Sequence, residues 1–159
     1  MARLPGIVHG VVVQITIAAE ASLASTDAER RSALRLLDGA GVRRPGLRLT
    51  LGADTQYQAA EFVAALRERA VAPHLSEYVH GNLGKNHLTA EERADPWRLV
   101  SQRRRKLIER VFGWSKLNCG LRQVKLRGLK RVDWFYRLTM SAYNLVRMRK
   151  LIPIQTRAS

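Results

Sequence analysis

Apolar and polar residues alternate along the first half of the chain in blocks that predict strands and helices in turn. The β-branched run "GVVVQITIAA", residues 10–19, predicts a buried strand, as do "LRLTLGAD", residues 47–54, and "VAPHLSEYV", residues 71–79. Residues 27–38 and residues 57–70 instead place their apolar side chains on one helical face, which predicts two amphipathic helices. This order is typical of an α/β fold in which at least part of the sheet is parallel.

The second half of the chain has the pattern of helices joined by polar or basic loops. Residues 80–97 are polar and contain two glycines and a proline, which indicates a loop or an excursion from the fold. A helix is predicted from about residue 100 to 117, followed by an irregular basic stretch, residues 120–132. Asp133 is expected to cap a last helix over residues 133–151. The apolar stripe expected on this helix consists of Phe135, Leu138, Ala142 and Leu145.

The length of the chain favours one domain. The 159 residues suffice for one compact unit with a core, but not for two. We predict a single domain over residues 1–159, with a strand and helix core at 10–79, the excursion at 80–97 and a basic helical part at 98–159. No apolar run is long enough for a transmembrane helix. The single cysteine, Cys119, excludes an internal disulfide and suits a cytoplasmic location.

The positive charge is concentrated in the second half of the chain. The whole sequence has 28 Lys and Arg against 13 Asp and Glu, a net charge of +15. Residues 98–159 hold 17 of the basic residues and only two acids, Glu109 and Asp133, so the first 97 residues are neutral. Such asymmetry predicts a polyanionic partner, most commonly nucleic acid. A membrane surface or ribosomal RNA would satisfy the same electrostatics.

Two carboxylates have positions that suit metal-dependent chemistry. Asp54 ends a predicted strand, and the edge formed by such strand ends is where α/β sheets build their sites. Glu109 lies in the basic helix, on one stripe with Arg105, Phe112 and Lys116. Phosphodiester chemistry uses carboxylates to hold two divalent ions about 3.5–4 Å apart, and Mg²⁺ suits such ligands. Simpler interpretations are a helix cap for Asp54 and a helical salt bridge for Glu109.

Four stretches together resemble a known family. They are "TLGADTQY", "SQRRRKLIERVFGWSK", "GLRQVKLRGLKRV" and "AYNLVRMRKL", and they are similar to the C-terminal half of bacterial insertion-sequence transposases of the DDE type. The spacing of Arg105, Glu109 and Lys116 matches the signature around that family's last catalytic acid. Gln102 stands where some relatives have tyrosine. The resemblance implies an incomplete ribonuclease-H-like α/β fold, with a mixed sheet of about three strands and four helices.

The resemblance also assigns roles to individual residues. It implies that Asp54 and Glu109 are the second and third catalytic acids and bind Mg²⁺ or Mn²⁺. Arg105 and Lys116 would contact DNA ends or phosphates near the site. Further DNA contacts are expected from Arg103, Arg104, Lys125, Arg127, Lys130 and Arg131. Phe112 and Trp114 are expected to anchor the Glu109 helix to the core, and the four histidines to lie at the surface or in loops.

The front of the chain departs from the family. The first catalytic Asp of such transposases lies on the first strand of a three-strand meander, whereas one predicted strand precedes residues 27–38 here. Glu20 and Asp27 are acids ahead of that helix or at its start, but neither lies on a first strand. We therefore expect a truncated, remnant or split transposase chain that is inactive by itself. Strands without ladder partners also predict marginal stability or aggregation.

These considerations leave two functional hypotheses. The first is a DNA transposase that uses Mg²⁺ for strand cleavage and transfer, with transposon ends and target DNA as partners. It implies a bacterial cytoplasmic, nucleoid-associated protein with no membrane partner, and a possible homo-oligomer or complementing transposase half. The alternative is a non-catalytic basic protein that binds DNA or RNA through the surface of residues 98–150.

Overall fold

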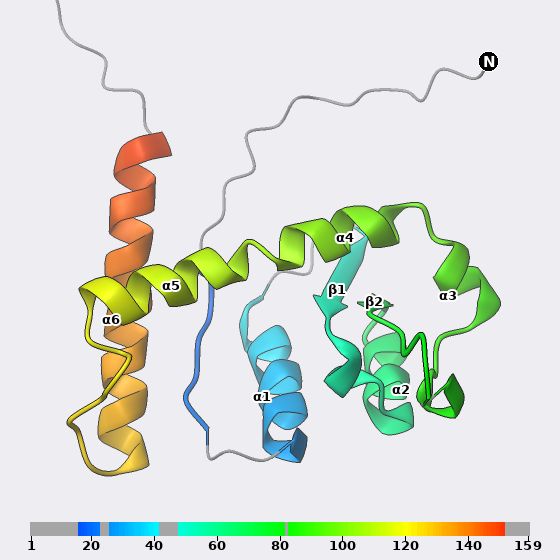
Figure 1. Cartoon of the computed structure of the whole chain (residues 1–159), viewed down its shortest axis with the longest axis horizontal. Coiled ribbons are helices and arrows are strands. Elements are labelled where there is room, and N and C mark those ends of the chain that lie inside the picture. The colour runs from blue at the N-terminus through cyan, green and yellow to red at the C-terminus, as the bar shows by residue number, and fades with distance from the viewer. Residues whose placement is uncertain (1–15, 23–25, 42–47, 82, 152–159) are drawn as a thin grey trace, which may run out of the picture.

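The computed structural model describes residues 16–22, 26–41, 48–81 and 83–151. Helices cover both faces of a small parallel sheet, and a long C-terminal helix stands beside that unit (Figure 1). The elements in chain order are α1 (Thr26–Gly39), β1 (Leu49–Ala53), the 3₁₀ helix η1 (Thr55–Tyr57), α2 (Ala60–Glu68), β2 (Val71–Leu75), the 3₁₀ helix η2 (Leu83–Lys85), α3 (Ala90–Ala94), α4 (Trp97–Arg105), α5 (Ile108–Asn118) and α6 (Leu129–Leu151).

The sheet of the described residues is formed by β1 and β2. The two strands run parallel, with Leu49 opposite Val71 and Ala53 opposite Leu75. Both strands lie within the ranges predicted from the sequence. The connection between them is α2, which packs against β2. Parallel strands need such a crossover, so the strand–helix–strand pattern of residues 47–79 is confirmed.

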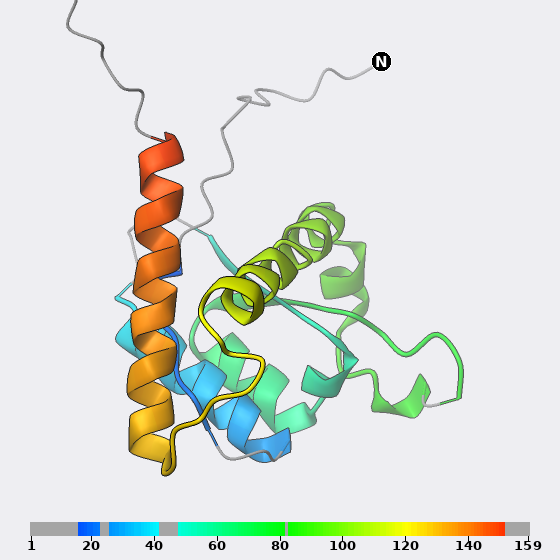
Figure 2. The ribbon, with the colours of Figure 1, turned by 60° about the vertical axis from the view of Figure 1, so that its left-hand side comes forward.

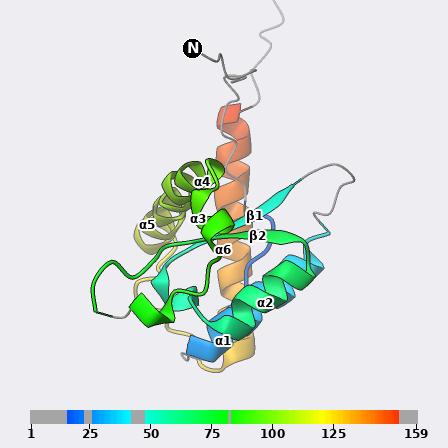
Figure 3. The same ribbon diagram turned by 90° about the vertical axis from the view of Figure 1, so that its right-hand side faces the viewer.

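The main core lies between the sheet and the two helices on one of its faces. Phe62, Val63 and Leu66 of α2 are buried against both strands, and apolar residues of α1 pack on the same cluster. The opposite face is covered by α4. Figure 3 shows α4 on one side of the strands, with α1 and α2 on the other. The sheet is therefore sandwiched between helices, as expected for parallel strands.

A second, smaller core joins α5 to α6 (Figure 2). Val111, Met140 and Tyr143 are buried there, and Trp114 lies edge-on to Tyr143 with ring centroids 5.5 Å apart. The expected anchoring role of Trp114 is thus confirmed. Phe112 is different, because its side chain is 39% exposed and lines a cavity.

The apolar stripe predicted for α6 is wrong. Leu138 and Leu145 are exposed, whereas Thr139, Met140 and Tyr143 are the buried residues of this helix. Residues 136, 140 and 143 also follow helical spacing, so the helix has two apolar faces. The sequence could not reveal which of the two α5 would cover.

The predicted cap of α6 is also wrong. The helix begins at Leu129, so Asp133 already lies inside it. Its carboxylate accepts a hydrogen bond from the Ala21 N–H at 2.7 Å and another from Arg137 Nε at 2.7 Å. Asp133 therefore ties the N-terminal segment to α6.

The sequence predicts four helices, and the described residues form six. One additional helix, α3, arises in the expected excursion at residues 80–97. The other arises because the helix expected over residues 100–117 is divided into α4 and α5 at Lys106 and Leu107. The Leu107 N–H bonds to Arg104 O at 3.0 Å and the Arg110 N–H to Leu107 O at 3.2 Å, which is 3₁₀ spacing.

The sheet has two strands in the described residues instead of the predicted mixed sheet of about three. Residues 10–15 of the first predicted strand lie outside the described residues, and residues 16–19 belong to no strand. The backbone of Thr16 instead bonds to the Asn144 side chain, with N–H to Oδ1 at 2.8 Å and Nδ2 to C=O at 2.7 Å. The Asn144 side chain of α6 thus makes the two backbone hydrogen bonds that a neighbouring strand would otherwise make with Thr16.

Candidate functional site

Asp54 lies at the carboxyl end of β1, as the sequence predicts. Its backbone is extended, and its Oδ1 accepts a hydrogen bond from the Gln56 N–H at 3.0 Å, so Asp54 caps η1. An aspartate is favoured at such a position because it satisfies a free N–H of the first helical turn. The capping interpretation of Asp54 is therefore confirmed, and this contact occupies one oxygen of the carboxylate.

Helix α4 is fastened across the ends of both strands by Gln102. Its Nε2 donates to Ala53 O at 3.1 Å and also to His74 O. Its Oε1 accepts from Ser76 Oγ at 2.9 Å and from Arg105 Nε at 3.1 Å. Gln102, which stands where some relatives have tyrosine, therefore connects α4 to the sheet.

A buried polar network also fixes α4, at Ser101 and at Asp95 just before the helix begins. His74 is 1% exposed, and its Nδ1 lies 2.7 Å from Ser101 Oγ and its Nε2 3.0 Å from Asp95 Oδ2. Because a carboxylate only accepts, Nε2 is the donor to Asp95. Asp95 also accepts from the Trp97 N–H at 2.9 Å and pairs with Arg48. The expectation that His74 lies at the surface or in a loop is wrong, although its place within a predicted strand was a signal of burial.

Gly52 allows this close approach of helix and strand. A Cβ at position 52 would lie 3.2 Å from the backbone oxygen of Ser101. A side chain there would push α4 away from β1, so the absence of a Cβ helps to position the helix that carries Gln102 and Arg105.

Asp95 makes the stability of this arrangement depend on pH. Burial opposes its charge, but the Trp97 N–H, His74 and Arg48 together hold the pKa of the carboxyl below its usual value. Because the pKa is lower in the folded state, the stabilisation is complete above the unfolded-state pKa of about 3.9 and is lost as pH falls further. We expect the urea midpoint to fall as the pH is lowered from about 4 toward 2, and to fall less in Asp95→Asn. Equal acid sensitivity in both proteins would contradict this assignment.

Glu109 occupies the first turn of α5, where it is exposed. Arg105 ends α4 and is half-buried against Gln102, so the two signature residues lie on opposite sides of the break at Lys106 and Leu107. The single stripe expected for Arg105, Glu109, Phe112 and Lys116 is therefore interrupted. Lys116, Arg103 and Arg104 are exposed.

The predicted metal site is incomplete in the part of the chain that the structure describes. No group of three or more His, Cys, Asp or Glu side chains there is arranged to hold a metal ion. The assignment of Asp54 and Glu109 as joint ligands therefore stays a prediction.

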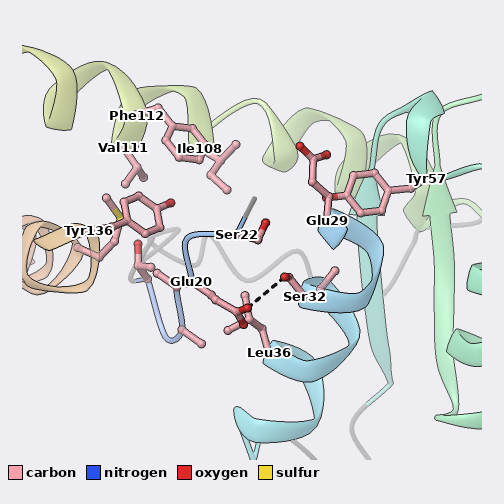
Figure 4. Close-up of a pocket in the computed structure, with 15 residues that line it drawn as sticks. Glu20, Ser22, Glu29, Ser32, Leu36, Tyr57, Ile108, Val111, Phe112 and Tyr136 are labelled. Carbon is pink, nitrogen blue, oxygen red and sulfur yellow. Dashed lines mark hydrogen bonds between the residues drawn. The ribbon is translucent and has the colours of Figure 1, made fainter. Parts of the chain in front are cut away.

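A cavity of about 440 Å³ adjoins this edge of the fold. It lies between α1, α5, α6 and residues 18–22, and Figure 4 shows Glu20, Glu29, Tyr57, Ile108 and Phe112 around it. Burial raises the pKa of Tyr57, and the negative charges of Glu29 and Asp54 raise it further. Glu29 and Asp54 thus both raise the pKa of the Tyr57 hydroxyl, although the two acids lie far apart in the sequence.

A basic surface follows α5. Residues 110–132 contain no Asp or Glu, and Lys125, Arg127, Lys130 and Arg131 are exposed in the loop before α6 and in its first turn. Lys125 also lines a shallow hollow with Arg122 and Gln123. We call Lys125, Arg127, Lys130 and Arg131 the basic loop cluster. Their contact with phosphates stays a prediction.

Fold and site together define a class of protein: an α/β unit with a carboxylate at the end of a parallel strand and a basic helical surface suited to nucleic acid. Residues 67–149 match the family model described as "Transposase DDE domain". The match covers more than half of the chain, which therefore belongs to the transposase DDE-domain family. It includes Gln102, Arg105, Glu109 and Lys116, and begins after Asp54. Neither the curated proteins nor the solved structures gave a match.

None of the described helices is both long enough and apolar enough to span a bilayer.

Proposed function

We propose that the chain serves DNA transposition by holding DNA on its basic helical surface beside the Asp54 edge of the sheet. One observation carries this proposal. Helix α4, within the segment that matches the transposase family, is bonded through Gln102 to the ends of both strands, directly beside Asp54. The signature residues Arg105 and Glu109 follow that anchor along the chain, which supports a shared role for Glu109 and the strand-end acid in this proposal.

The DNA would be bound mainly through its phosphates. The exposed Arg103, Arg104 and Lys116 supply positive charge on α4 and α5, which also carry the signature, and the basic loop cluster adds charge before α6 and in its first turn. Lys and Arg contacts to phosphate release counterions and give affinity without sequence selection. Transposon ends and target DNA are the partners that this proposal implies.

The metal is the second part of the proposal. Asp54 and Glu109 are the residues that would ligate Mg²⁺ or Mn²⁺, which when bound activates an attacking oxygen and stabilises the leaving one. The described residues alone do not fit a complete site, because they bring no third ligand to these two. We derive no catalytic step from them, and we propose that the chain alone does not cleave DNA.

Replacing Glu109 with glutamine distinguishes a role of this residue in DNA binding from a role in catalysis. Glu109 is an exposed carboxylate among cations, so Glu109→Gln should leave the affinity for duplex DNA within about twofold or raise it slightly. Fluorescence anisotropy with a labelled duplex at fixed salt measures this affinity. In a transposition reaction that contains the remaining catalytic parts, the same change should abolish strand transfer.

The comparison has a matched control. Glu91→Gln removes an exposed carboxylate of α3, away from the signature, and should change neither readout. Strand transfer that survives Glu109→Gln would refute the catalytic role and favour a non-catalytic DNA-binding protein. Mg²⁺-dependent cleavage by the chain alone, lost in Glu109→Gln, would show that a third ligand is present after all.

A further inference from the structure

Helix α6 has a stripe of large apolar side chains that are open to solvent. The members of this stripe are Trp134, Leu138, Leu145 and Met148. The side chain of Trp134 is 63% exposed and that of Leu145 66%, so neither belongs to the core between α5 and α6. In Figure 1, α6 stands at the end of the molecule away from α3, and its C-terminal end extends past α5. Apolar side chains that gather on one exposed face mark an interaction surface.

The spacing of the stripe fits a single helix lying along α6. Trp134, Leu138, Ser141, Leu145 and Met148 follow one another at intervals of four, three, four and three residues. This is the heptad repeat of helices that pack side by side, in which two positions of every seven face the partner. From Trp134 to Met148 the stripe is about 21 Å long, or about four helical turns. Ser141, its polar member, donates to Arg137 O at 3.1 Å, so its hydroxyl is satisfied within α6.

The two flanks of the stripe are basic. In the heptad repeat Arg137 lies on one flank and Arg149 on the other, and both are exposed. Helix α6 contains six Lys and Arg but a single acid, Asp133, whose carboxylate bonds to the Ala21 N–H and to Arg137. Charges at these flanking positions decide which helices pair. The charge of α6 itself therefore favours a partner helix with carboxylates on both flanks.

Other occupants fit this face less well. A second copy would bring two helices of the same positive charge side by side, which costs free energy. The phosphates of DNA would satisfy the arginines but would leave the apolar row without apolar contacts. An anionic lipid surface would supply negative charge and apolar contact, but it has no periodicity that matches a heptad repeat. Apolar spacing and flanking charge together select an acidic helix.

We propose that the exposed face of α6 docks an acidic amphipathic helix of a partner protein. The partner helix lies along Trp134 to Met148, with its own apolar side chains between those of α6. It carries Glu or Asp opposite Arg137 and Arg149. The inference rests on the spacing, exposure and local charge of α6, and does not require the proposed DNA chemistry.

A synthetic acidic helix tests the proposal directly. The probe is a labelled peptide of about 21 residues, with Leu at the two seam positions of each heptad, Glu at the two flanking positions and Ala elsewhere. Repulsion between its own Glu side chains opposes self-pairing at neutral pH. Fluorescence anisotropy measures its affinity for the full chain. In NMR spectra the indole N–H signal of Trp134 should shift on binding, whereas that of Trp97, which is 60% exposed on α4, should not.

A matched pair of substitutions tests the apolar contact. Leu145→Glu places a charge in the stripe and should weaken peptide binding by about tenfold or more. Leu99→Glu makes the same change at an equally exposed leucine of α4 and should alter the affinity by less than about twofold. Both side chains are exposed, so both variants should fold, and circular dichroism checks this.

A second pair tests the charge. Arg149→Glu should weaken binding of the acidic peptide by about tenfold, whereas Arg31→Glu makes the same change at an exposed arginine of α1 and should weaken it by less than about threefold. A peptide with Lys in place of every Glu should bind the parent chain at least about tenfold more weakly than the acidic peptide. It should bind Arg149→Glu more tightly than it binds the parent.

Five results would overturn the proposal. Unchanged peptide affinity in Leu145→Glu, or an equal loss in Leu99→Glu, would show that the stripe does not hold the helix. Equal affinity for the acidic and basic peptides would remove the role of charge. Self-association of the parent chain that is lost in Leu145→Glu, measured by analytical ultracentrifugation, would assign the face to a second copy. Binding to vesicles of phosphatidylglycerol and phosphatidylcholine that is lost in the same variant would assign it to lipid.

DNA affinity separates this proposal from the one for transposition. Affinity for a labelled duplex should be the same within about twofold in the parent chain and in Leu99→Glu and Leu145→Glu, because each variant adds the same charge outside the basic loop cluster. A loss confined to Leu145→Glu would assign the stripe to DNA and overturn the helix proposal. Weak duplex binding by all three proteins would count against the DNA proposal alone.

Discussion

Replacing Lys125, Arg127, Lys130 and Arg131 together with alanine is expected to weaken duplex DNA binding by about a hundredfold or more at 0.1 M salt. Each of these cations is exposed, residues 110–132 contain no Asp or Glu, and each cation is expected to displace about one counterion from DNA. The slope of log affinity against log salt should therefore become less negative by about 3 to 4. Titrations by fluorescence anisotropy at several salt concentrations measure both quantities.

A matched pair of double variants controls for net charge. Lys125→Ala with Arg127→Ala removes two charges of the basic loop cluster. Arg31→Ala with Lys85→Ala removes two exposed charges from the neutral first part of the chain. The first pair should cost about tenfold in affinity and the second less than about threefold. Equal losses would mean that net charge, and not this surface, holds the DNA.

Replacing His74 with alanine is expected to lower the free energy of unfolding by about 3–4 kcal/mol. The change leaves a cavity under α4 and removes the ring that bonds both Ser101 and Asp95. Because small domains are stable by only about 5–15 kcal/mol, a large fraction of the protein could unfold. Urea denaturation followed by circular dichroism measures the loss.

His80→Ala is the control for this experiment. His80 is exposed, so its removal should change the free energy of unfolding by less than about 0.5 kcal/mol. If His74→Ala unfolds at the same urea concentration as the parent, the buried network does not fasten α4 to the sheet.

Local pattern was sufficient to predict the framework of the fold. The alternating apolar residues of 47–54 and 71–79 and the amphipathic helix between them correspond to β1, α2 and β2. The pattern was insufficient wherever a tertiary partner decides the outcome. No Pro or Gly marks the break at Lys106 and Leu107, where the chain passes from packing on the sheet to packing on α6. The wrong face of α6 was predicted to be buried for the same reason, because packing against α5 decides which face is covered.

The candidate site was predictable in its parts but not in its assembly. The placement of Asp54 at a strand end and of Glu109 on a basic helix followed from sequence. The network of His74, Asp95 and Ser101 could not be found in that way, because its members are 21 and 27 residues apart along the chain. Whether Asp54 and Glu109 bind one metal ion depends on where the fold places their side chains, which no local sequence pattern specifies. Their role as metal ligands therefore remains a prediction.

The short 3₁₀ stretch between α4 and α5 divides the signature between two packing environments. Arg105 bonds to Gln102, which bonds to the sheet, whereas Glu109 lies on α5, which packs on α6. A change of angle at this joint would alter the separation of guanidinium and carboxylate without disturbing either core.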